Sequence, residues 1–197
     1  MTCLRLLTPL LLLCALPSIS YAETFLTPWL GVTLGGELED QNGQTYDLKP
    51  SESYAFSLEH TLDKGRIGLF YATQSTDVEK ISEQATTHYL HFQSSIYYPL
   101  NPGLSSYVGV GLGASYMDAQ WVDDHTGFSA SIFGGFDYQL NSQLSVNTQV
   151  RWLGTVVDND TSGICNLPSD GSEQCIIRFK TDWMNQFTAN IGLTWRF

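Results

Sequence analysis

The last 15 residues of the chain alternate between apolar and polar side chains, and no other feature constrains the fold as strongly. One face of this segment carries Trp183, Asn185, Phe187, Ala189, Ile191, Leu193, Trp195 and Phe197, of which only Asn185 is polar. The other face carries Met184, Gln186, Thr188, Asn190, Gly192, Thr194 and Arg196. Successive side chains point to opposite faces of a β-strand, whereas a helix repeats every 3.6 residues. The segment therefore predicts a long strand with one apolar face.

Seven earlier segments alternate in the same way. They span residues 28–37, 54–60, 66–74, 87–98, 107–116, 128–138 and 145–156. Within 107–116, for example, Val108, Val110 and Leu112 alternate with glycines. Together with the last segment they predict eight strands in one domain, because no interdomain linker separates them.

The connections between these segments are short and long in turn. The short connections contain residues that favour tight turns, such as Asp-Lys-Gly and Asn-Pro-Gly, and span 61–65, 99–105 and 139–144. The long connections are polar and span about 38–53, 75–86, 117–127 and 157–182. An even number of strands with short turns at one end and long loops at the other is typical of an up-and-down barrel. We predict an all-β, eight-stranded antiparallel barrel.

Two kinds of barrel fit the alternation, because a soluble carrier turns its apolar face inward around a ligand and a membrane barrel turns it outward. Aromatic residues at both ends of the apolar faces favour the membrane barrel, since such residues gather at membrane interfaces. They are Tyr98, Tyr138, Trp195 and Phe197 near the short turns, and Tyr54, Tyr71, Tyr116, Phe128 and Trp183 toward the long loops. A central arginine on the lipid side would also cost about 2–4 kcal/mol. We therefore predict a transmembrane β-barrel with a polar interior.

The polar faces of the strands supply the expected lining of the lumen. Its candidate residues are Glu59, Arg66, His91, Gln93, Tyr97, Asp137, Gln149, Arg151 and Arg196. Eight strands enclose a space only just wide enough for side chains, so paired charges should plug it. A narrow pore for ions or small solutes is the alternative, and inward-facing Gly109, Gly111 and Gly113 are the feature that favours it.

The first 22 residues have the composition of an export signal. Arg5 gives a cationic start, residues 6–16 are apolar, and Ser20-Tyr21-Ala22 forms a small-x-small cleavage site. We expect cleavage before Glu23, which divides the chain into a signal peptide, 1–22, and a barrel domain, 23–197.

Residues 23–197 carry a net charge of −12, because they hold all 20 acidic residues and eight of the nine basic ones. This balance opposes binding to the phosphates of nucleic acids. Many of the acidic residues fall in the long connections, such as Glu39 and Asp40 in the first and Asp123 and Asp124 in the third. We expect acidic surface loops that select an unidentified cationic or protein partner, or a surface bridged by divalent cations.

Residues 187–197 resemble the C-terminal strand of Gram-negative outer-membrane proteins, whose last residue is usually Phe. The resemblance implies that Trp195 and Phe197 form the signal that the barrel-assembly machinery reads. As a whole, residues 23–197 are similar to OmpA/OmpX-type small barrels and to the wider porin-like families. This similarity implies a monomer in the bacterial outer membrane, surrounded by lipid and lipopolysaccharide. It fixes no function, because these families include structural anchors, adhesins, small pores and lipid A-modifying enzymes.

The outer-membrane lipid A deacylases are the enzymes that the pattern resembles in outline, and they carry a His-x-Ser pair on one strand. The four histidines here lie in His60-Thr-Leu, His88-Tyr-Leu, His91-Phe-Gln and His125-Thr-Gly, so the pair is absent. We therefore expect no enzyme, no catalytic residue and no cofactor. A structural or surface-interaction protein with a plugged lumen is the preferred function, followed by the narrow pore and then by an interfacial lipid A-modifying enzyme.

Two cysteines, Cys165 and Cys175, fall in the last long connection, and an oxidising cell surface favours a disulfide between them. Residues 176–180 resume the alternation of the last strand. We expect that strand to continue above the membrane as a hairpin with the seventh strand, capped by the disulfide.

Asp158 and Asp160 begin a partial calcium-loop pattern in the same connection. The fifth position of the pattern is Ser162, and Ser169 replaces the glutamate of its twelfth position. We expect a solvated acidic loop here and no specific metal site.

Overall fold

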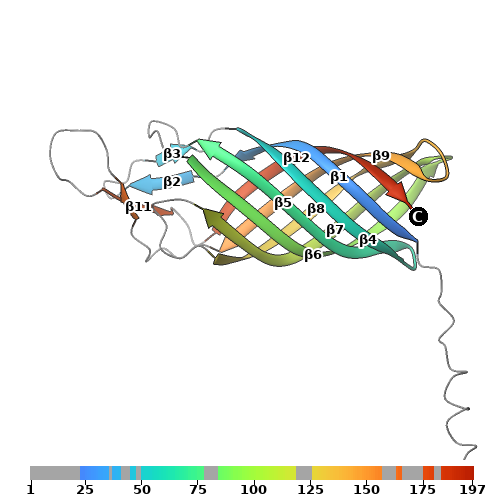
Figure 1. Ribbon diagram of the computed structural model, residues 1–197, viewed down its shortest axis with the longest axis horizontal. Coiled ribbons are helices and arrows are strands. Elements are labelled where there is room, and N and C mark those ends of the chain that lie inside the picture. The colour runs from blue at the N-terminus through green and yellow to red at the C-terminus, as the bar shows by residue number, and fades with distance from the viewer. Residues whose placement is uncertain are drawn as a thin grey trace, which may run out of the picture.

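The computed structural model of the 197-residue chain describes residues 23–35, 37–40, 45–47, 50–77, 84–118, 126–156, 163–165, 175–179 and 183–197. In the short segments 37–40, 45–47, 163–165 and 175–179 only the backbone is described. Every regular element within these ranges is a β-strand (Figure 1). No helix in the described part of the chain is long and apolar enough to cross a membrane.

Eight long strands form a closed barrel in which every pair of neighbours is antiparallel (Figure 1). They are β1 (Thr24–Gly35), β4 (Ser51–Leu62), β5 (Gly65–Asp77), β6 (Gln84–Asn101), β7 (Leu104–Asp118), β8 (Thr126–Gln139), β9 (Leu144–Val156) and β12 (Trp183–Arg196). Their order around the barrel is β1-β12-β9-β8-β7-β6-β5-β4. Barrel strands that are consecutive in the sequence are therefore neighbours in the barrel. The structure confirms the predicted eight-stranded up-and-down barrel.

The barrel closes between the first and last strands. The Thr24 N–H donates to the Phe197 carbonyl oxygen at 2.9 Å, and the Phe197 N–H donates to the Thr24 carbonyl oxygen at 3.0 Å. These bonds lie at the end of the barrel that also holds the three short turns, which we call the turn end. The opposite end, where the long connections leave the barrel, is the loop end.

Seven of the eight strands are longer than the alternation predicted, because backbone pairing continues past the apolar stretch of each strand. The longest, β6, pairs with β5 from Ile96 opposite Gly65 up to Gln84 opposite Asp77. Two turns at the turn end use the left-handed backbone region, at Asp63 with φ 49° and at Gly103 with φ 81°. Aspartate tolerates this region and glycine favours it, so these residues suit the turns predicted at 61–65 and 99–105.

A second, four-stranded sheet lies beyond the loop end of the barrel (Figure 1). It consists, in order, of β10 (Gly163–Cys165), β11 (Cys175–Phe179), β2 (Glu37–Asp40) and β3 (Thr45–Asp47). The expected hairpin with the seventh strand is therefore wrong in its partners, because β11 pairs with β10 on one side and with β2 on the other. The alternation showed that a strand was present, but its partner comes from the first long connection, which is distant in sequence.

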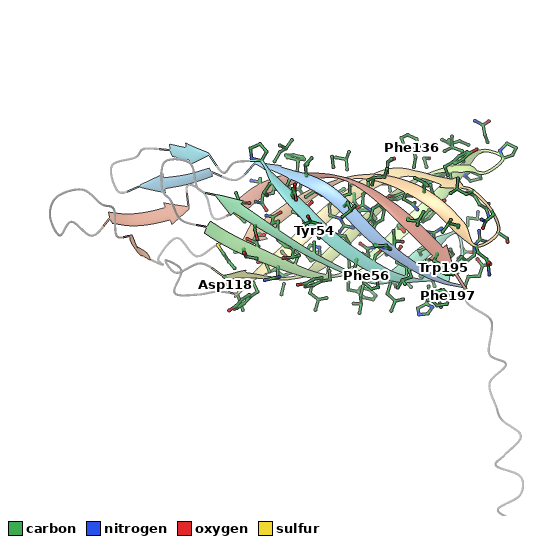
Figure 2. The ribbon with its side chains drawn as sticks, turned by 45° about the horizontal axis from the view of Figure 1, so that its top comes forward. Tyr54, Phe56, Asp118, Phe136, Trp195 and Phe197 are labelled. Atoms are coloured by element: carbon green, nitrogen blue, oxygen red, sulfur yellow. The ribbon has the colours of Figure 1, made fainter. Side chains whose placement is uncertain are left out.

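The side chains of the barrel wall have the opposite distribution to that of a soluble protein. Apolar side chains in the middle of the strands face outward and are exposed, for example Leu69, Phe92 and Ile132. Figure 2 shows Tyr54, Phe56, Phe136 and Trp195 projecting from the outer surface. Among the described residues the buried polar side chains outnumber the buried apolar ones. Because exposed apolar surface of this extent needs a lipid environment, the outward face is the membrane-facing one.

Candidate functional site

The barrel interior holds a chain of hydrogen-bonded polar side chains and packed aromatic rings that runs along its axis. Its centre is Arg151 on β9, whose side chain is completely buried. Nε donates to Gln149 Oε1 at 3.1 Å, Nη1 to Ser131 Oγ at 2.8 Å and Nη2 to Gln93 Oε1 at 2.6 Å. Charge-assisted bonds of this kind orient the guanidinium across the lumen from β9 to β6 and β8.

Two phenylalanine rings cover the faces of the same guanidinium. Its central carbon lies 3.7 Å from the centroid of the Phe70 ring and 4.1 Å from that of Phe133. Cation–π contacts of this kind strengthen when water is excluded. Arg151 is therefore held both in its plane, by hydrogen bonds, and above and below its plane, by rings.

Gln93 on β6 connects this arginine to a buried carboxylate on β4. Its amide nitrogen donates to Glu59 Oε1 at 2.9 Å while its amide oxygen accepts from Arg151. The side chains of Glu59 and Gln93 are both buried. The three residues thus link a carboxyl group and a guanidinium through an amide, and this link spans the lumen from one wall to the other.

His91 lies beside this bridge, and both of its ring nitrogens contact hydroxyl groups of β8. Nδ1 lies 3.0 Å from Ser131 Oγ and Nε2 lies 2.6 Å from Ser129 Oγ. The ring is fully buried and packs near Phe70 and Tyr89. With both nitrogens engaged in a closed interior, His91 acts as a packing and hydrogen-bonding residue.

The layer toward the loop end centres on Gln186 of β12. Its Oε1 accepts from the Tyr89 hydroxyl and from Gln74 Nε2, each at 2.7 Å. Trp29 fills the space beside this layer, and its Nε1 donates to Ser57 Oγ at 3.1 Å. The lumen is therefore crossed a second time, from β12 to β5 and β6.

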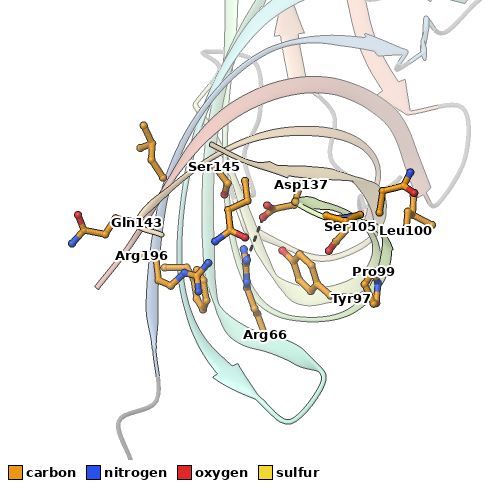
Figure 3. Close-up of a pocket in the computed structure, with 15 residues that line it drawn as sticks. Arg66, Tyr97, Pro99, Leu100, Ser105, Asp137, Gln143, Ser145 and Arg196 are labelled. Carbon is orange, nitrogen blue, oxygen red and sulfur yellow. Dashed lines mark hydrogen bonds and ion pairs between the residues drawn. The ribbon is translucent and has the colours of Figure 1, made fainter. Parts of the chain in front are cut away.

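Toward the turn end the interior opens into a cavity of about 550 Å³, which we call the vestibule (Figure 3). At its inner boundary Arg66 Nη2 lies 3.2 Å from Asp137 Oδ2. The Arg66 guanidinium carbon is 3.7 Å from the Phe25 ring centroid and 4.2 Å from that of Tyr97. Arg196 also lines the vestibule and pairs with Glu23 at 3.4 Å. The two arginines are thus already held by carboxylates and rings.

Tyrosines separate the vestibule from the Arg151 layer. The rings of Tyr97 and Tyr107 stack with centroids 5.0 Å apart. The Tyr107 hydroxyl donates to the Thr148 carbonyl oxygen at 3.0 Å and lies 3.4 Å from Gln149 Nε2. This stack connects the two layers, because Gln149 also accepts from Arg151.

Side chains of the neighbouring strands fill the space beside the inward-facing glycines on β7. A Cβ at Gly109 would collide with the ring of Phe133. A Cβ at Gly111 would lie 2.7 Å from Ser131 Oγ and 3.3 Å from His91 Nδ1. The glycines therefore make room for the side chains of the Arg151 layer.

The nine candidate lining residues all face the interior. Six are buried and three are half-buried, the latter being Arg66, Tyr97 and Arg196 at the turn end. The structure divides them into the Arg151 layer, which includes Glu59, His91, Gln93 and Gln149, and the vestibule, which includes Arg66, Tyr97, Asp137 and Arg196.

Large aromatic residues share the interior, and they were not predicted from the sequence. They are Phe25, Trp29, Phe70, Tyr89, Tyr107 and Phe133, and all are buried. Each has the inward parity of its strand, as Phe70 does between outward-facing Leu69 and Tyr71. The inward parity of these positions is therefore the sequence signal that identifies them.

The remaining candidate residues lie outside the lumen. Trp195 and Phe197 are 58% and 65% exposed on the outward face of the turn end (Figure 2). The backbones of Cys165 and Cys175 are directly opposite each other in the β10–β11 pair, while their side chains lie outside the described residues. Asp158 and Asp160 lie wholly outside them. Within the described part of the chain no three His, Cys, Asp or Glu side chains converge as metal ligands would.

Residues 6–197 match a family described as the outer membrane protein beta-barrel domain. No curated protein sequence matches the chain significantly. Among solved structures, Neisserial surface protein A is similar with a TM-score of 0.62 at 9% identity, over 89% of this chain and 97% of that one. OprG from Pseudomonas aeruginosa has a TM-score of 0.62 at 14% identity, over 89% and 96% of the two chains. Ail of Yersinia pestis has a TM-score of 0.52 at 10% identity, over 89% and 99%. At these identities the likeness is one of fold.

Proposed function

Since this chain belongs to the outer membrane protein beta-barrel family, we propose that it is an integral outer-membrane protein that acts through its surface loops while its lumen stays closed. The observation that carries the proposal is the Glu59–Gln93–Arg151 bridge, which spans the lumen at its centre. A solute would have to break buried, charge-assisted hydrogen bonds to pass it. The protein is thus a structural or surface-interaction barrel.

The distribution of charge supports a role for the loop end. In barrels of the outer membrane the short turns face the periplasm and the long loops face the cell exterior. Sixteen of the 20 acidic residues lie in the loop-end connections or near the loop ends of strands, the exceptions being Glu23, Glu59, Asp63 and Asp137. The basic residues on that side are Lys49, Lys80, Arg178 and Lys180. The exterior side therefore carries the whole net charge of the barrel domain, −12, and a cationic or protein partner complements it.

The names of two similar structures agree with a surface role. One is a surface protein of Neisseria, and the other is the attachment invasion locus protein of Yersinia pestis. A narrow pore is the second candidate, because the vestibule already opens the turn-end part of the path. The Arg151 layer argues against it. An enzymatic role is disfavoured too, since His91 is enclosed with both ring nitrogens in contact with serines.

Export and biogenesis complete the proposal. We expect residues 1–22 to be removed on export, the barrel-assembly machinery to recognise Trp195 and Phe197, and the mature barrel to be a monomer in lipid and lipopolysaccharide. N-terminal sequencing of the membrane-inserted protein should begin at Glu23. A sequence that begins at Met1 would contradict the assignment of the signal peptide.

A loop-trimmed variant tests the role of the surface. Replacing each of the four long connections by a short turn should leave the barrel heat-modifiable on gels, since the described hydrogen bonds across the lumen join residues of the barrel strands. Cells that display the full protein should bind a fluorescent octalysine peptide, and cells that display the trimmed barrel should not. Equal binding by the two would contradict the proposal that the loops carry the interaction.

A further inference from the structure

A cluster of three rings faces outward near the loop ends of β5, β6 and β7. His88 on β6 lies between Tyr71 and Tyr116, with ring centroids 6.1 Å and 6.2 Å away. Its chain neighbours Thr87 and Tyr89 are buried in the lumen, so its own side chain is on the outer surface. The hydrogen bonds that cross the lumen do not include this cluster.

The cluster lies at the level where lipid headgroups meet the barrel. His88 is ten residues before Tyr98, which belongs to the exposed aromatic residues of the turn end. At about 3.3 Å per residue and a tilt of about 40°, the two are roughly 25 Å apart along the barrel axis. This distance equals the height of the apolar band of a membrane barrel, about 25 Å. His88 is therefore at the outer interface when Tyr98 is at the periplasmic one.

The hydrogen bond at one nitrogen of the imidazole leaves the other nitrogen, Nε2, to face a ligand. The Tyr71 hydroxyl lies 2.9 Å from His88 Nδ1. When that hydroxyl donates, Nδ1 accepts and the proton of the neutral ring is on Nε2. Further hydroxyl groups lie on the same outer surface, at Thr73 opposite His88 and in the Ser75–Thr86 pair, 3.0 Å apart. Together they offer donors and ring faces of the kind that bind sugars and phosphates.

The described side chains on the opposite wall of the barrel offer no such chemistry at the same level. Asn185 on β12 is ten residues before Trp195, which is the spacing of His88 and Tyr98, and its Oδ1 accepts from Trp152 Nε1 at 3.1 Å. Around this pair the outward residues are apolar, such as Phe187 and Leu34. Among the described outward-facing side chains of β1, β9 and β12, none is titratable. The outer interface is thus chemically distinct on the β5–β7 side.

We propose that Tyr71, His88 and Tyr116 bind the phosphate-bearing headgroup of an outer-leaflet glycolipid. The site is continuous with the apolar band directly below it, where Leu69, Leu90 and Leu112 are exposed to the acyl chains of the same lipid. A lipid whose acyl chains already contact this band places its headgroup at the cluster with little further loss of entropy. The inference rests on the orientation proposed above, with the loop end outside.

Two carboxylates at the edge of the site add a requirement for cations. Glu52 accepts from the Tyr54 hydroxyl at 2.9 Å on β4, and Asp118 ends β7 near the loop end (Figure 2). A phosphate beside these groups would be repelled unless a divalent cation lies between them, since Mg²⁺ and Ca²⁺ bind carboxylate and phosphate oxygens together. Binding should therefore be weaker after chelation of divalent cations.

The test uses the full barrel in nanodiscs that contain deep-rough lipopolysaccharide, with retained lipid measured by native mass spectrometry. His88→Ala should weaken retention about tenfold, since one donor and a stacked ring are lost. Tyr71→Phe should weaken it less, because the ring stays. Asn185→Ala on the opposite wall is the matched control and should have no effect. If His88→Ala and Asn185→Ala behave alike, the proposal is wrong.

The choice of lipid separates phosphate recognition from general lipid contact. The same lipopolysaccharide with its phosphates removed should bind the wild type no better than it binds His88→Ala. Equal retention of the two glycolipids by the wild type would overturn the phosphate assignment. Should His88→Ala fail to show heat-modifiable folding, His88→Gln keeps a donor of similar length and should retain lipid better than His88→Leu. None of these readouts depends on whether the lumen conducts or the loops bind a partner.

Discussion

The inner and outer walls of the barrel are built from alternate residues of the same strands, yet they are stabilised in different ways. Outside, Val150 and its neighbours need only be apolar, because lipid contacts them without direction. Inside, the next residue, Arg151, depends on one hydrogen bond within β9 and on two hydrogen bonds and two rings from other strands. The comparison shows that the outer wall tolerates any apolar side chain while the inner wall requires particular partners.

The largest expected effect comes from removing the central cation. Arg151→Ala leaves Gln93, Ser131 and Gln149 without their donor and Glu59 without its bridged partner. We expect a loss of about 3–5 kcal/mol in the free energy of unfolding, as for other broken buried charge networks. Urea titration of the protein folded in lipid vesicles measures it. Arg196→Ala, at a half-buried position of the turn end, should lower the free energy of unfolding much less. Equal losses for the two variants would contradict the importance of the central layer.

Placing the same cation one residue earlier tests the outer wall. Val150→Arg puts a guanidinium in the middle of the lipid-facing band and should cost about 2–4 kcal/mol. Val150→Leu is its control and should be close to neutral in the same titration. If Val150→Arg left the free energy of unfolding unchanged, this part of β9 would not face the membrane.

The predicted disulfide between Cys165 and Cys175 would affect a region that belongs to neither wall. In β10 and β11 the backbones of Cys165 and Cys175 are directly opposite each other, at a separation that a disulfide can span. Closing this loop should stabilise the small sheet by about 2–3 kcal/mol. Cys165→Ser with Cys175→Ser should leave assembly and heat-modifiability intact while protease cleaves residues 157–182 faster. Failure of the double variant to assemble would place the bridge in the folding of the barrel.

The smallest expected effect is the loss of one hydroxyl from the inner wall. Tyr107→Phe keeps the stack on Tyr97 but removes the bond to the Thr148 carbonyl oxygen. A loss of about 0.5–1.5 kcal/mol follows from one net hydrogen bond. Tyr138→Phe, whose ring faces outward, is the matched control. A larger loss for Tyr138→Phe would reverse the contrast between the two walls.

Much of the barrel could be predicted from the sequence because the patterns that specify its strands and turns involve residues close together in the chain. Alternation and turn residues depend on neighbours such as Leu193, Thr194 and Trp195, and they predicted all eight strands. The pairing of β11 with β2 could not be predicted in this way, since its partners are more than a hundred residues apart. The hydrogen bond from Arg151 to Gln93 could not be predicted either, because the alternation along each strand shows only that both side chains face inward.

The filling of the lumen could be predicted only in part. In the sequence Gly109, Gly111 and Gly113 favour a pore, because a glycine has no side chain to fill the lumen. In the structure the side chains of neighbouring strands occupy the space beside them, among them Phe133 and His91. A prediction of this packing needs the register of β6, β7 and β8 relative to one another, which the sequence of one strand does not contain.

Single-channel recording of the refolded protein in planar bilayers tests the central claim most directly. With the Arg151 layer intact, the barrel should show no steady conductance in molar KCl at either polarity. The refolded Gln93→Ala variant, which loses the link between Glu59 and Arg151, should show brief openings if it keeps its fold. A steady, reproducible conductance of the unmodified barrel would contradict a closed lumen and make this protein a pore.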